Sequence, residues 1–377
     1  MRICIISPRY AKEISGGAER LAMNYAEILS EEHSVTVLTT TALDYTTWKN
    51  ELKSGVSPGN PQIIRFDSKS RRDRNFDKFS KKIQQASSAE KLQEKWLEYQ
   101  GPYTPELVDS IQKINADVYF FIPYLYYPVV KGIPLVKNKA ILIPALHDEW
   151  PAYLPMYSKI FTRDIVYSFN TPEEILVFKK IFGFIPKKYA VTGMEVSQIP
   201  VSLKKTIYEK YFLVIGRIEE GKGINELIEQ FVRWNSKYND KYSLVLAGKT
   251  SGKIRNGKNI IKTGYIDELA KASLLNNAIA LVNPSSLESF SIVIMEAWLA
   301  KKPVLVNGKS EVLVGHVTRS NGGLWYTDSD SFCAVMDYLQ KNPEIASEMG
   351  MNGNRYVLQN YNRETIRAKL NHLLQMV

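Results

Sequence analysis

The stretch that decides the fold is Tyr211–Tyr238, YFLVIGRIEEGKGINELIEQFVRWNSKY, which begins with the pattern of a buried strand and ends with that of a helix. A glycine-rich turn separates the two parts. The same order of strand, glycine turn and helix opens the chain at Ile3–Ser30. Short apolar strands alternating with helical segments follow each copy, which is typical of a parallel sheet with helices on both faces. The restart of the pattern predicts two such sheets in one chain.

The chain of 377 residues has room for two domains. We place the linker near residues 197–207, because the second series of strands begins just beyond it. The predicted domains are then 1–200 and 201–360, followed by a helical tail at 361–377. Further strands are predicted at 35–39, 117–122, 141–144, 165–169, 243–247, 260–262, 279–283 and 304–306, and further helices at 269–275, 292–300 and 363–376.

The composition is that of an ordinary globular chain, with 45% hydrophobic and 23% charged residues. The two cysteines, Cys4 and Cys333, have neither CxxC nor Cys/His ligand spacing, which indicates a reducing compartment and no structural zinc. No apolar run reaches the roughly 20 residues that span a bilayer, and the first residues become polar too soon for a secretory signal. We therefore expect a cytoplasmic protein.

The net charge of +10 indicates an anionic partner, such as a phosphate, an anionic lipid or a nucleic acid, without choosing among them. The charge has a local maximum at Lys69–Lys82, where seven basic residues stand against two acidic ones. Phe66, Phe76 and Phe79 are interleaved with these cations, which suits a membrane surface carrying anionic lipid. A solvated charged loop and helix face fits the same residues.

Several motifs with known chemistry are incomplete in this chain. Gly248-Lys249-Thr250 is not the end of a phosphate-binding P-loop, because Ser243 stands where that motif needs glycine. Gly221–Glu226 begins like GxGxxG but ends in glutamate. Asp328-Ser329-Asp330 precedes a helical pattern and is predicted to cap that helix instead of holding a metal. The four histidines have no metal-ligand spacing, so the chemistry must come from something other than a metal or a protein nucleophile.

Two carboxylates, Glu288 and Glu296, stand eight residues apart across a loop and the start of a predicted helix. The helical rise puts them on the order of 10 to 12 Å apart, comparable to the distance between the sugar and the ribose of one nucleotide sugar. The backbone amides of Ser289, Phe290 and Ser291 precede the helix, where unpaired N–H groups favour phosphate or hydroxyl oxygens. A solvated Glu288 and a structural Glu296 fit the stretch equally well when it is taken alone.

Two cations stand beside glycines at the start of the second domain. Gly216-Arg217 ends the predicted strand, and Lys222-Gly223 begins the next helix. A guanidinium fork and an ammonium group in this position suit a diphosphate leaving group, because both stabilise the charge that develops as the bond to phosphate breaks. Ordinary surface charges are the alternative for both residues.

Taken together, these residues resemble the retaining glycosyltransferases of family 4, also called glycosyl transferases group 1. The resemblance runs nearly end to end, since Gly16–Arg20, His147-Asp148 and Gly322–Leu324 match further motifs of that family in the same order. It implies the GT-B architecture, an α/β fold in which two Rossmann-like, doubly wound parallel-sheet domains face each other across a cleft. Residues 1–200 would bind the acceptor, 201–360 the nucleotide sugar, and 361–377 would pack back toward the first domain.

The resemblance also implies the roles of individual residues. His147 would contact a hydroxyl of the donor sugar near the reacting carbon, although a buried histidine at a strand end fits the same position. Ser289 and Ser291 depart from the family, which often has glycine there, so they put the donor identity in question. The catalytic set implied is His147, Arg217, Lys222 and Glu288, and the donor-binding set is Gly16, Gly17, Gly216, Arg217, Lys222, Tyr265, Ile266, Glu288, Ser289, Phe290, Ser291, Ile292 and Glu296.

The implied reaction moves a hexose-type sugar from a nucleotide sugar, with UDP favoured and GDP second, to a glycan or lipid-linked acceptor in bacterial cell-surface polysaccharide synthesis. It would retain the anomeric configuration and need no metal or cofactor besides the nucleotide sugar. A nucleotide-sugar epimerase of the same fold and a non-catalytic relative are the alternatives. A nucleic-acid binder is disfavoured, because no recognition helix or stacking platform is present. The residues expected at an acceptor or at the inner face of the cell membrane are Arg71, Arg72, Arg74, Lys78, Lys81 and Lys82.

Overall fold

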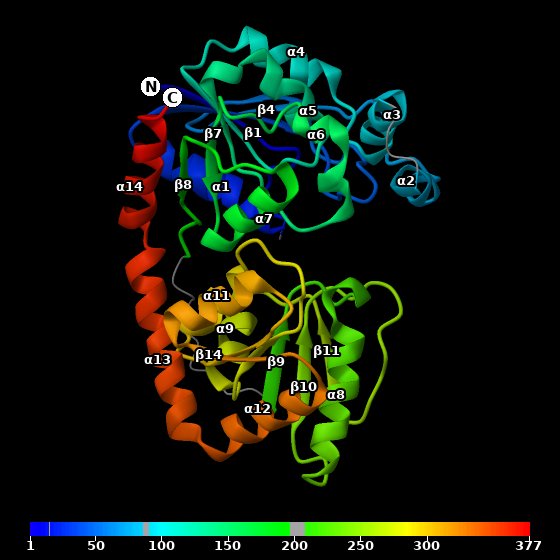
Figure 1. The fold of residues 1–377 in the computed structure, drawn as a ribbon, viewed down its shortest axis with the longest axis vertical. Helices are drawn as coiled ribbons and strands as arrows, with labels where there is room; N and C mark the ends of the chain where they lie inside the picture. The colour runs from blue at the N-terminus through cyan, green and yellow to red at the C-terminus, as the bar shows by residue number, and fades with distance from the viewer. Residues whose placement is uncertain (15, 86–89, 197–207) are drawn as a thin grey trace. The chain divides into compact units, whose positions relative to one another are not determined.

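The computed structural model in Figure 1 describes residues 1–14, 16–85, 90–196 and 208–377. The chain divides into two compact units, Met1–Met194 with Arg363–Val377 and Glu195–Asn362. Each unit is built on a parallel or almost wholly parallel sheet with helices packed against it, so the predicted α/β class with two Rossmann-like units is confirmed. The predicted linker at 197–207 lies outside the described residues.

The sheet of the first unit has, among the described residues, eight strands in the order β3-β4-β2-β1-β5-β6-β7-β8. Among these described strands, only β3 and β4, at one edge, pair antiparallel. The strand order runs outward in both directions from β1 and β5, which are parallel neighbours. The strands are β1 (Arg2–Ile6), β2 (Ser34–Thr40), β3 (Gly55–Ser57), β4 (Gln62–Phe66), β5 (Val118–Phe121), β6 (Ala140–Leu142), β7 (Val166–Phe169) and β8 (Tyr189–Val191).

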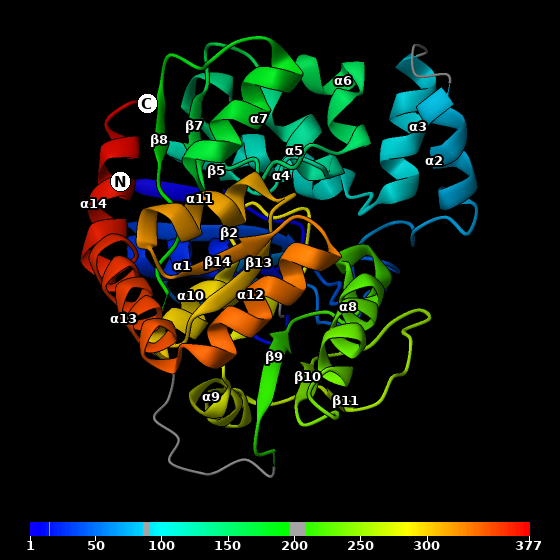
Figure 2. The same cartoon turned by 60° about the horizontal axis from the view of Figure 1, so that its bottom comes forward.

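The central strands of this sheet are buried on both faces because helices cover them. Ile3–Ile6 is buried throughout, and so is Val118–Phe121. Figure 2 shows α2 and α3 lying side by side. The α-helices are α1 (Gly17–Leu29), α2 (Phe76–Gln85), α3 (Glu90–Gln100), α4 (Pro105–Lys113), α5 (Tyr127–Gly132), α6 (Pro155–Ser158), α7 (Pro172–Phe182) and α14 (Arg363–Leu374), and short 3₁₀ turns cover Ile133–Leu135, Lys137–Lys139 and Trp150–Tyr153.

The last helix, α14, belongs to the first unit. It packs on α1 and lies beside β8. Arg363 and Arg367 both form ion pairs with Glu31, just beyond the end of α1. Its apolar face is fully buried at Ile366, Leu370 and Leu373. These contacts give the end of the chain a defined place on the unit that contains its beginning.

The sheet of the second unit has, within the part of the chain that is described, six parallel strands in the order β11-β10-β9-β12-β13-β14. This is the doubly wound order in which the first strand and the fourth are neighbours. The strands are β9 (Tyr211–Ile215), β10 (Ser243–Ala247), β11 (Ile260–Gly264), β12 (Leu281–Asn283), β13 (Val304–Asn307) and β14 (Gly323–Tyr326), and the helices are α8 (Ile224–Ser236), α9 (Glu268–Asn277), α10 (Ile292–Leu299), α11 (Glu311–Ser320), α12 (Ser329–Lys341) and α13 (Pro343–Asn360), with a 3₁₀ turn at Glu220–Lys222.

Most predicted elements lie within a few residues of the observed ones, and the predicted cap at Asp328 is confirmed. Its carboxylate accepts from the backbone N–H groups of Asp330 and Ser331 at the start of α12. The sequence patterns did not predict the strands β3, β4, β8 and β14. Of these, β3, β4 and β8 carry no fully buried residue, so their apolar signal is weak.

Candidate functional site

Two loops of the second unit, one of them rich in glycine, meet at the carboxyl ends of adjacent strands. Residues 216–223 follow β9, and residues 284–291 follow β12, its parallel neighbour. This is the switch point at which the strand order reverses, where open α/β sheets bind their ligands. The fold therefore brings together the two stretches that the sequence analysis selected.

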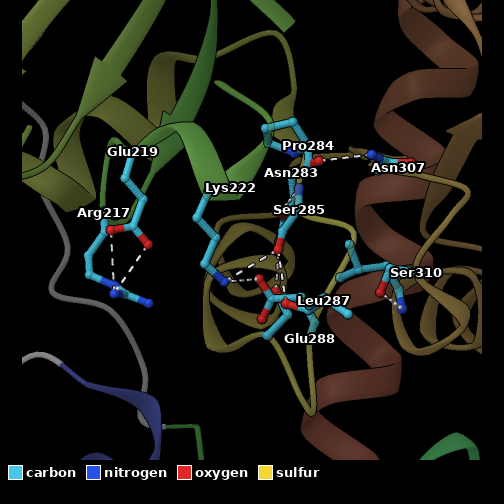
Figure 3. Close-up of polar contacts among 12 residues, drawn as sticks. Arg217, Glu219, Lys222, Asn283, Pro284, Ser285, Leu287, Glu288, Asn307 and Ser310 are labelled. Carbon is cyan, nitrogen blue, oxygen red and sulfur yellow. Dashed lines mark hydrogen bonds and ion pairs between the residues drawn. The ribbon is translucent and has the colours of Figure 1, made fainter. Parts of the chain in front are cut away.

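Lys222 and Glu288 form an ion pair in these loops, with 3.0 Å between Nζ and Oε1 (Figure 3). Lys222 Nζ also donates to Ser285 Oγ at 3.3 Å. Both charged side chains are partly exposed, 28% for the lysine and 18% for the glutamate. The predicted phosphate-binding cation and the predicted sugar-binding carboxylate are thus neighbours, with polar atoms open to a ligand.

Gly223 allows this close approach of the two loops. Its φ of 74° lies in the left-handed region, where glycine carries no steric penalty. A Cβ atom at this position would also lie 2.6 Å from the carbonyl oxygen of Pro284. Any other residue would push the turn that carries Lys222 away from Ser285 and Glu288.

Two asparagines that the sequence analysis did not select hold the loop after β12. Asn283 Oδ1 accepts from the backbone N–H of Ser285 at 3.0 Å, and Asn307 Nδ2 donates to the carbonyl of Pro284 at 2.9 Å. Asn283 Nδ2 also donates to Ser291 Oγ at 2.9 Å. The signal that could have identified them is that β12 and β13 both end in asparagine.

Ser291 is the residue before α10, and it has a φ of 68° in the left-handed region. This conformation explains why glycine is common at the position in the family that the chain resembles. The hydrogen bond from Asn283 gives the serine hydroxyl a defined partner there. Ser289 is partly buried in the same loop and Ile292 begins the helix, so the predicted N–H groups do precede α10.

The ring of Phe290 anchors this loop inside the second unit. It packs edge-on against His316 of α11 and against Tyr361, with ring centroids 5.6 and 5.0 Å apart. His316 is fully buried, and burial lowers its pKa to about 3. The imidazole is therefore neutral at physiological pH. Its ring contact with Phe290 helps to fix the position of this loop.

Glu296 lies in α10 and forms a buried ion pair with Lys271 of α9, with 2.8 Å between Nζ and Oε1. The side chain of Lys271 is only 8% exposed and that of Glu296 only 4%. Lys271 also pairs with Glu268, one turn earlier in its own helix. Lys271 was not predicted as a site residue, because a lysine beside apolar residues in a short helix carries no signal of burial.

The remaining predicted residues of the second unit lie on its surface. Arg217 pairs with Glu219 at 3.2 Å, and its side chain is 50% exposed. Gly216 has a φ of 135° and its carbonyl lies against Gly248. Tyr265 is 81% exposed in the loop between β11 and α9, with Ile266 beside it. In Figure 3 the dashed lines join Arg217 to Glu219 and Lys222 to a separate group of residues.

In the first unit, Gly16 and Gly17 stand at the start of α1. A Cβ atom at Gly16 would lie 2.0 Å from Glu19 Oε2, so any other residue here would displace that carboxylate. Glu19 forms a buried ion pair with Arg9, and each of the two side chains is only 10% exposed. Gly17 has open space where a Cβ would stand, which leaves its backbone accessible.

His147 lies in the loop after β6, and its side chain is 30% exposed. Its Nδ1 lies 3.8 Å from Glu149 Oε1, which accepts a hydrogen bond from the Tyr124 hydroxyl at 3.0 Å. The alternative of a fully buried strand-end histidine therefore does not apply. The ring is accessible to a ligand at the carboxyl end of the first sheet.

The basic segment departs from the prediction in two ways. Phe66, Phe76 and Phe79 are half-buried against the first core, so the exposed face of α2 is basic instead of aromatic. Arg72 is half-buried too, since its guanidinium lies 4.5 Å from the centre of the Phe76 ring and Nε donates to the carbonyl of Gln100 at 3.4 Å. Burial lowers its pKa. Of the six cations predicted to lie at the surface, Arg71, Arg74, Lys78, Lys81 and Lys82 are exposed.

In the described part of the chain, no group of three or more His, Cys, Asp or Glu side chains is placed to hold a metal ion. None of the helices described there is both long and apolar enough to cross a bilayer.

Comparison with known proteins bears on the family and the fold. Residues 198–375 match the family model described as glycosyl transferases group 1. The chain is 21% identical over 263 residues to alpha-monoglucosyldiacylglycerol synthase of Acholeplasma laidlawii, a match that covers 59% of this chain and 66% of that protein. The chain thus spans just under two thirds of the length of this relative.

The solved structures that resemble the chain share its whole fold. Sucrose-phosphate synthase from Thermosynechococcus elongatus superposes with a TM-score of 0.74 at 17% identity, covering 99% of this chain and 98% of that one. HepE of Anabaena in complex with UDP and glucose superposes with a TM-score of 0.70 at 12% identity, covering 100% of both chains. The family model and the fold together support a glycosyltransferase with the GT-B fold.

Proposed function

We propose that the protein is a family 4 retaining glycosyltransferase, which moves a hexose-type sugar from a nucleotide sugar to a glycan or lipid-linked acceptor. The observation that carries the proposal is the Lys222–Ser285–Glu288 group in the region that matches glycosyl transferases group 1. An ammonium group beside a carboxylate, both partly exposed, offers one partner for the donor phosphates and one for the sugar hydroxyls. Arg217 adds a second cation on the loop after the same strand.

The chemistry proposed for this site is mainly electrostatic. Departure of the nucleoside diphosphate leaves positive charge on the sugar ring and negative charge on the phosphate, and Lys222 stabilises the latter. Glu288 orients the sugar, the N–H groups of Phe290 and Ser291 offer donors to its hydroxyls, and Glu296 holds the ribose. In the first unit, Gly17 would lie at the donor phosphate and His147 at a sugar hydroxyl. Retention of configuration and independence of metal ions are part of the proposal.

UDP is the favoured nucleotide and GDP the second. The solved complex of HepE with UDP and glucose, which has the same fold, supports this order. The name of the Acholeplasma relative supports a lipid acceptor. The exposed cations of α2 and the residues before it would then bring the protein to an anionic membrane surface at the cytoplasmic face, where bacterial cell-surface polysaccharide is assembled.

The first experiment is a thermal-shift panel with UDP, GDP, ADP and their common sugar conjugates. A ligand that binds only the folded protein stabilises it, by about 2.7 kcal/mol at a ligand concentration of a hundred times Kd. The melting temperature rises as a result. We expect one nucleotide series to stabilise the wild type and Lys253→Ala, an exposed lysine of the same unit, but not Lys222→Ala or Glu296→Ala. No shift with any nucleotide would contradict the proposal.

Product analysis then tests the reaction itself. The conjugate that gives the largest shift is incubated with diacylglycerol in anionic vesicles or with soluble sugars, and the product is examined by NMR. Transfer with the anomeric configuration of the donor is expected. An altered sugar still attached to the nucleotide would indicate an epimerase, and inversion at the anomeric carbon would contradict the retaining mechanism.

A further inference from the structure

The loop that carries His147 bends sharply two residues before it. Ala145 has a φ of 49°, in the left-handed region that residues with a Cβ atom rarely adopt. The preceding residue, Pro144, is anchored through its carbonyl, which accepts from the N–H of Tyr124 at 3.2 Å. A strained bend persists only where its surroundings hold it, so a contact on the other side of Ala145 is required.

That contact is the carboxylate of Glu174, in the first turn of α7. Oε1 accepts from the backbone N–H of Leu146 at 2.7 Å, and Oε2 accepts from the backbone N–H of Asn170 at 2.6 Å. Glu174 is fully buried, and both N–H donors belong to residues that are at most 3% exposed. One carboxylate therefore joins the loop after β6 to the loop after β7.

The local sequence would by itself direct this side chain elsewhere. Thr171 caps α7, and its hydroxyl accepts from the N–H of Glu174 at 3.3 Å. In this Thr-x-x-Glu pattern the glutamate ordinarily turns back to the N–H of the capping residue. Here it reaches one residue further back and across to Leu146, so the side chain serves the neighbouring loop instead of completing its own helix cap.

A second residue of α7 holds the far side of the same loop. Lys180 forms an ion pair with Asp148 at 2.6 Å, and the hydroxyl of Tyr153 donates to the same carboxylate at 2.8 Å. His147 thus stands between two anchored neighbours, Leu146 and Asp148. Only Leu146 is held from inside the fold, because Lys180 is 64% exposed.

We propose that Glu174 is a positioning residue, whose ionised carboxylate holds Ala145–Asp148 in the conformation that presents the His147 ring to the donor sugar. The role of His147 in this statement rests on the proposed function, whereas the hold on the loop does not. Glu174 itself is buried and does not touch a substrate.

Protonation would release this hold at a pH close to neutral. Burial raises the pKa of Glu174 to about 7, against the opposing effect of the two N–H groups and of His147. The titratable groups that face it are His147 from the loop and Tyr25 from α1. In the protonated carboxyl group, one oxygen carries a hydrogen and faces an N–H group as a second donor. One of the two hydrogen bonds, to Leu146 or to Asn170, therefore weakens as the pH falls through about 7.

The hydrogen bond from Leu146 to Glu174 is tested without any ligand, by NMR on protein labelled with ¹⁵N-leucine. The Leu146 signal is assigned by its loss in Leu146→Met. We expect its amide shift to titrate near pH 7 in the wild type and in Glu173→Gln, the neighbouring carboxylate of the same helical turn. In Glu174→Gln, which presents an amide to one N–H, the titration is expected to vanish. An unchanged titration in Glu174→Gln would overturn the proposal.

Turnover of the nucleotide sugar tests the link to His147. We expect Glu174→Gln to lower kcat about tenfold or more at pH 8 with a smaller change in KM, and His147→Ala in that background to add little, because both changes act on one group. If the two losses multiply, Glu174 does not act through His147. If His147→Ala alone has no effect while the Leu146 titration is as expected, the role proposed for His147 fails and the hold stands.

A melting curve shows whether Glu174→Gln is folded. Should it fail to fold, Glu174→Asp keeps the charge but is one methylene shorter, so it cannot accept from both Leu146 and Asn170. A fall in kcat in the folded Glu174→Asp protein is then expected. Unchanged kcat with an unchanged Leu146 titration in Glu174→Asp would overturn the proposal.

Discussion

The loops after β6 and β12 solve the same problem with different chemistry. Each follows a strand at the carboxyl edge of its sheet, carries a candidate site residue and contains a non-glycine residue in the left-handed region, Ala145 in one and Ser291 in the other. Ser291 is held by the neutral amide of Asn283, whereas Ala145 is followed by an amide held by the buried carboxylate of Glu174. The first hold is independent of pH, and the second depends on a group that titrates near neutrality.

This difference shows that a bend can be fixed at a cost to stability elsewhere. The pKa of Glu174 is higher in the folded protein than in the unfolded chain, so ionising it works against folding. The ionised form is nevertheless the one that accepts both backbone N–H bonds. Asn283 and Asn307 do the equivalent work in the second unit without any charge. The following predictions test how far the two loops differ.

The largest expected effect is on turnover when the ammonium group is removed from the loop pair of the second unit. Lys222→Met should lower kcat about 10²- to 10³-fold, the range measured for loss of one preorganised electrostatic group. Steady-state kinetics with the nucleotide sugar selected by thermal shift measure the change, and Lys253→Met is the matched control. A fall of less than threefold would mean that Lys222 does not stabilise the leaving group.

Breaking the buried ion pair of the second unit should mainly affect stability. Lys271→Met removes the ammonium group that pairs with the buried carboxylate of Glu296, which costs about 3 kcal/mol. Chemical denaturation measures the loss. The double variant Lys271→Met/Glu296→Gln should recover most of it, because the buried negative charge is removed as well. Equal stability of the single and double variants would show that the charge of Glu296 is well solvated.

The titration of Glu174 predicts a pH dependence of stability in the first unit. Its raised folded pKa means that its contribution is fully present below about pH 4.5 and is lost as the pH rises through about 7. The stability difference between wild type and Glu174→Gln should therefore shift against the wild type between pH 5 and 8. Denaturation at the two pH values measures it, with Glu173→Gln as control. A difference that is constant with pH would contradict the shifted pKa.

The smallest effects are expected at the two bends themselves. Ser291→Ala keeps the left-handed strain and loses the bond to Asn283, at about 1 kcal/mol. Ala145→Gly relieves the strain and should stabilise the fold by up to about 1 kcal/mol. In thermal melts, the melting temperature is expected to fall for Ser291→Ala and to rise for Ala145→Gly. A stabilising Ser291→Ala would show that the hydroxyl does not compensate for the strained backbone.

The sequence predicted most of the fold and part of the candidate site. The strand Ser243–Ala247 was predicted to the residue, because an apolar run before a glycine turn is a local signal. Lys222 and Glu288 were selected from their place beside glycines and at a helix start. Lys271 and Glu174 were not selected, because an isolated charged residue in an amphipathic helix is ordinarily a surface residue.

What the sequence determined by itself was the α/β class, the two-unit order of elements and the glycine turns, because periodicity and turn chemistry act between neighbours in the chain. Only the tertiary structure decided which charges meet. Lys222 and Glu288 are 66 residues apart, Lys271 and Glu296 are 25 apart, and Glu174 and Leu146 are 28 apart. Such pairs form because parallel strands bring the loops at their carboxyl ends to one edge of a sheet and helices pack side by side, and no local pattern records which residues then become partners.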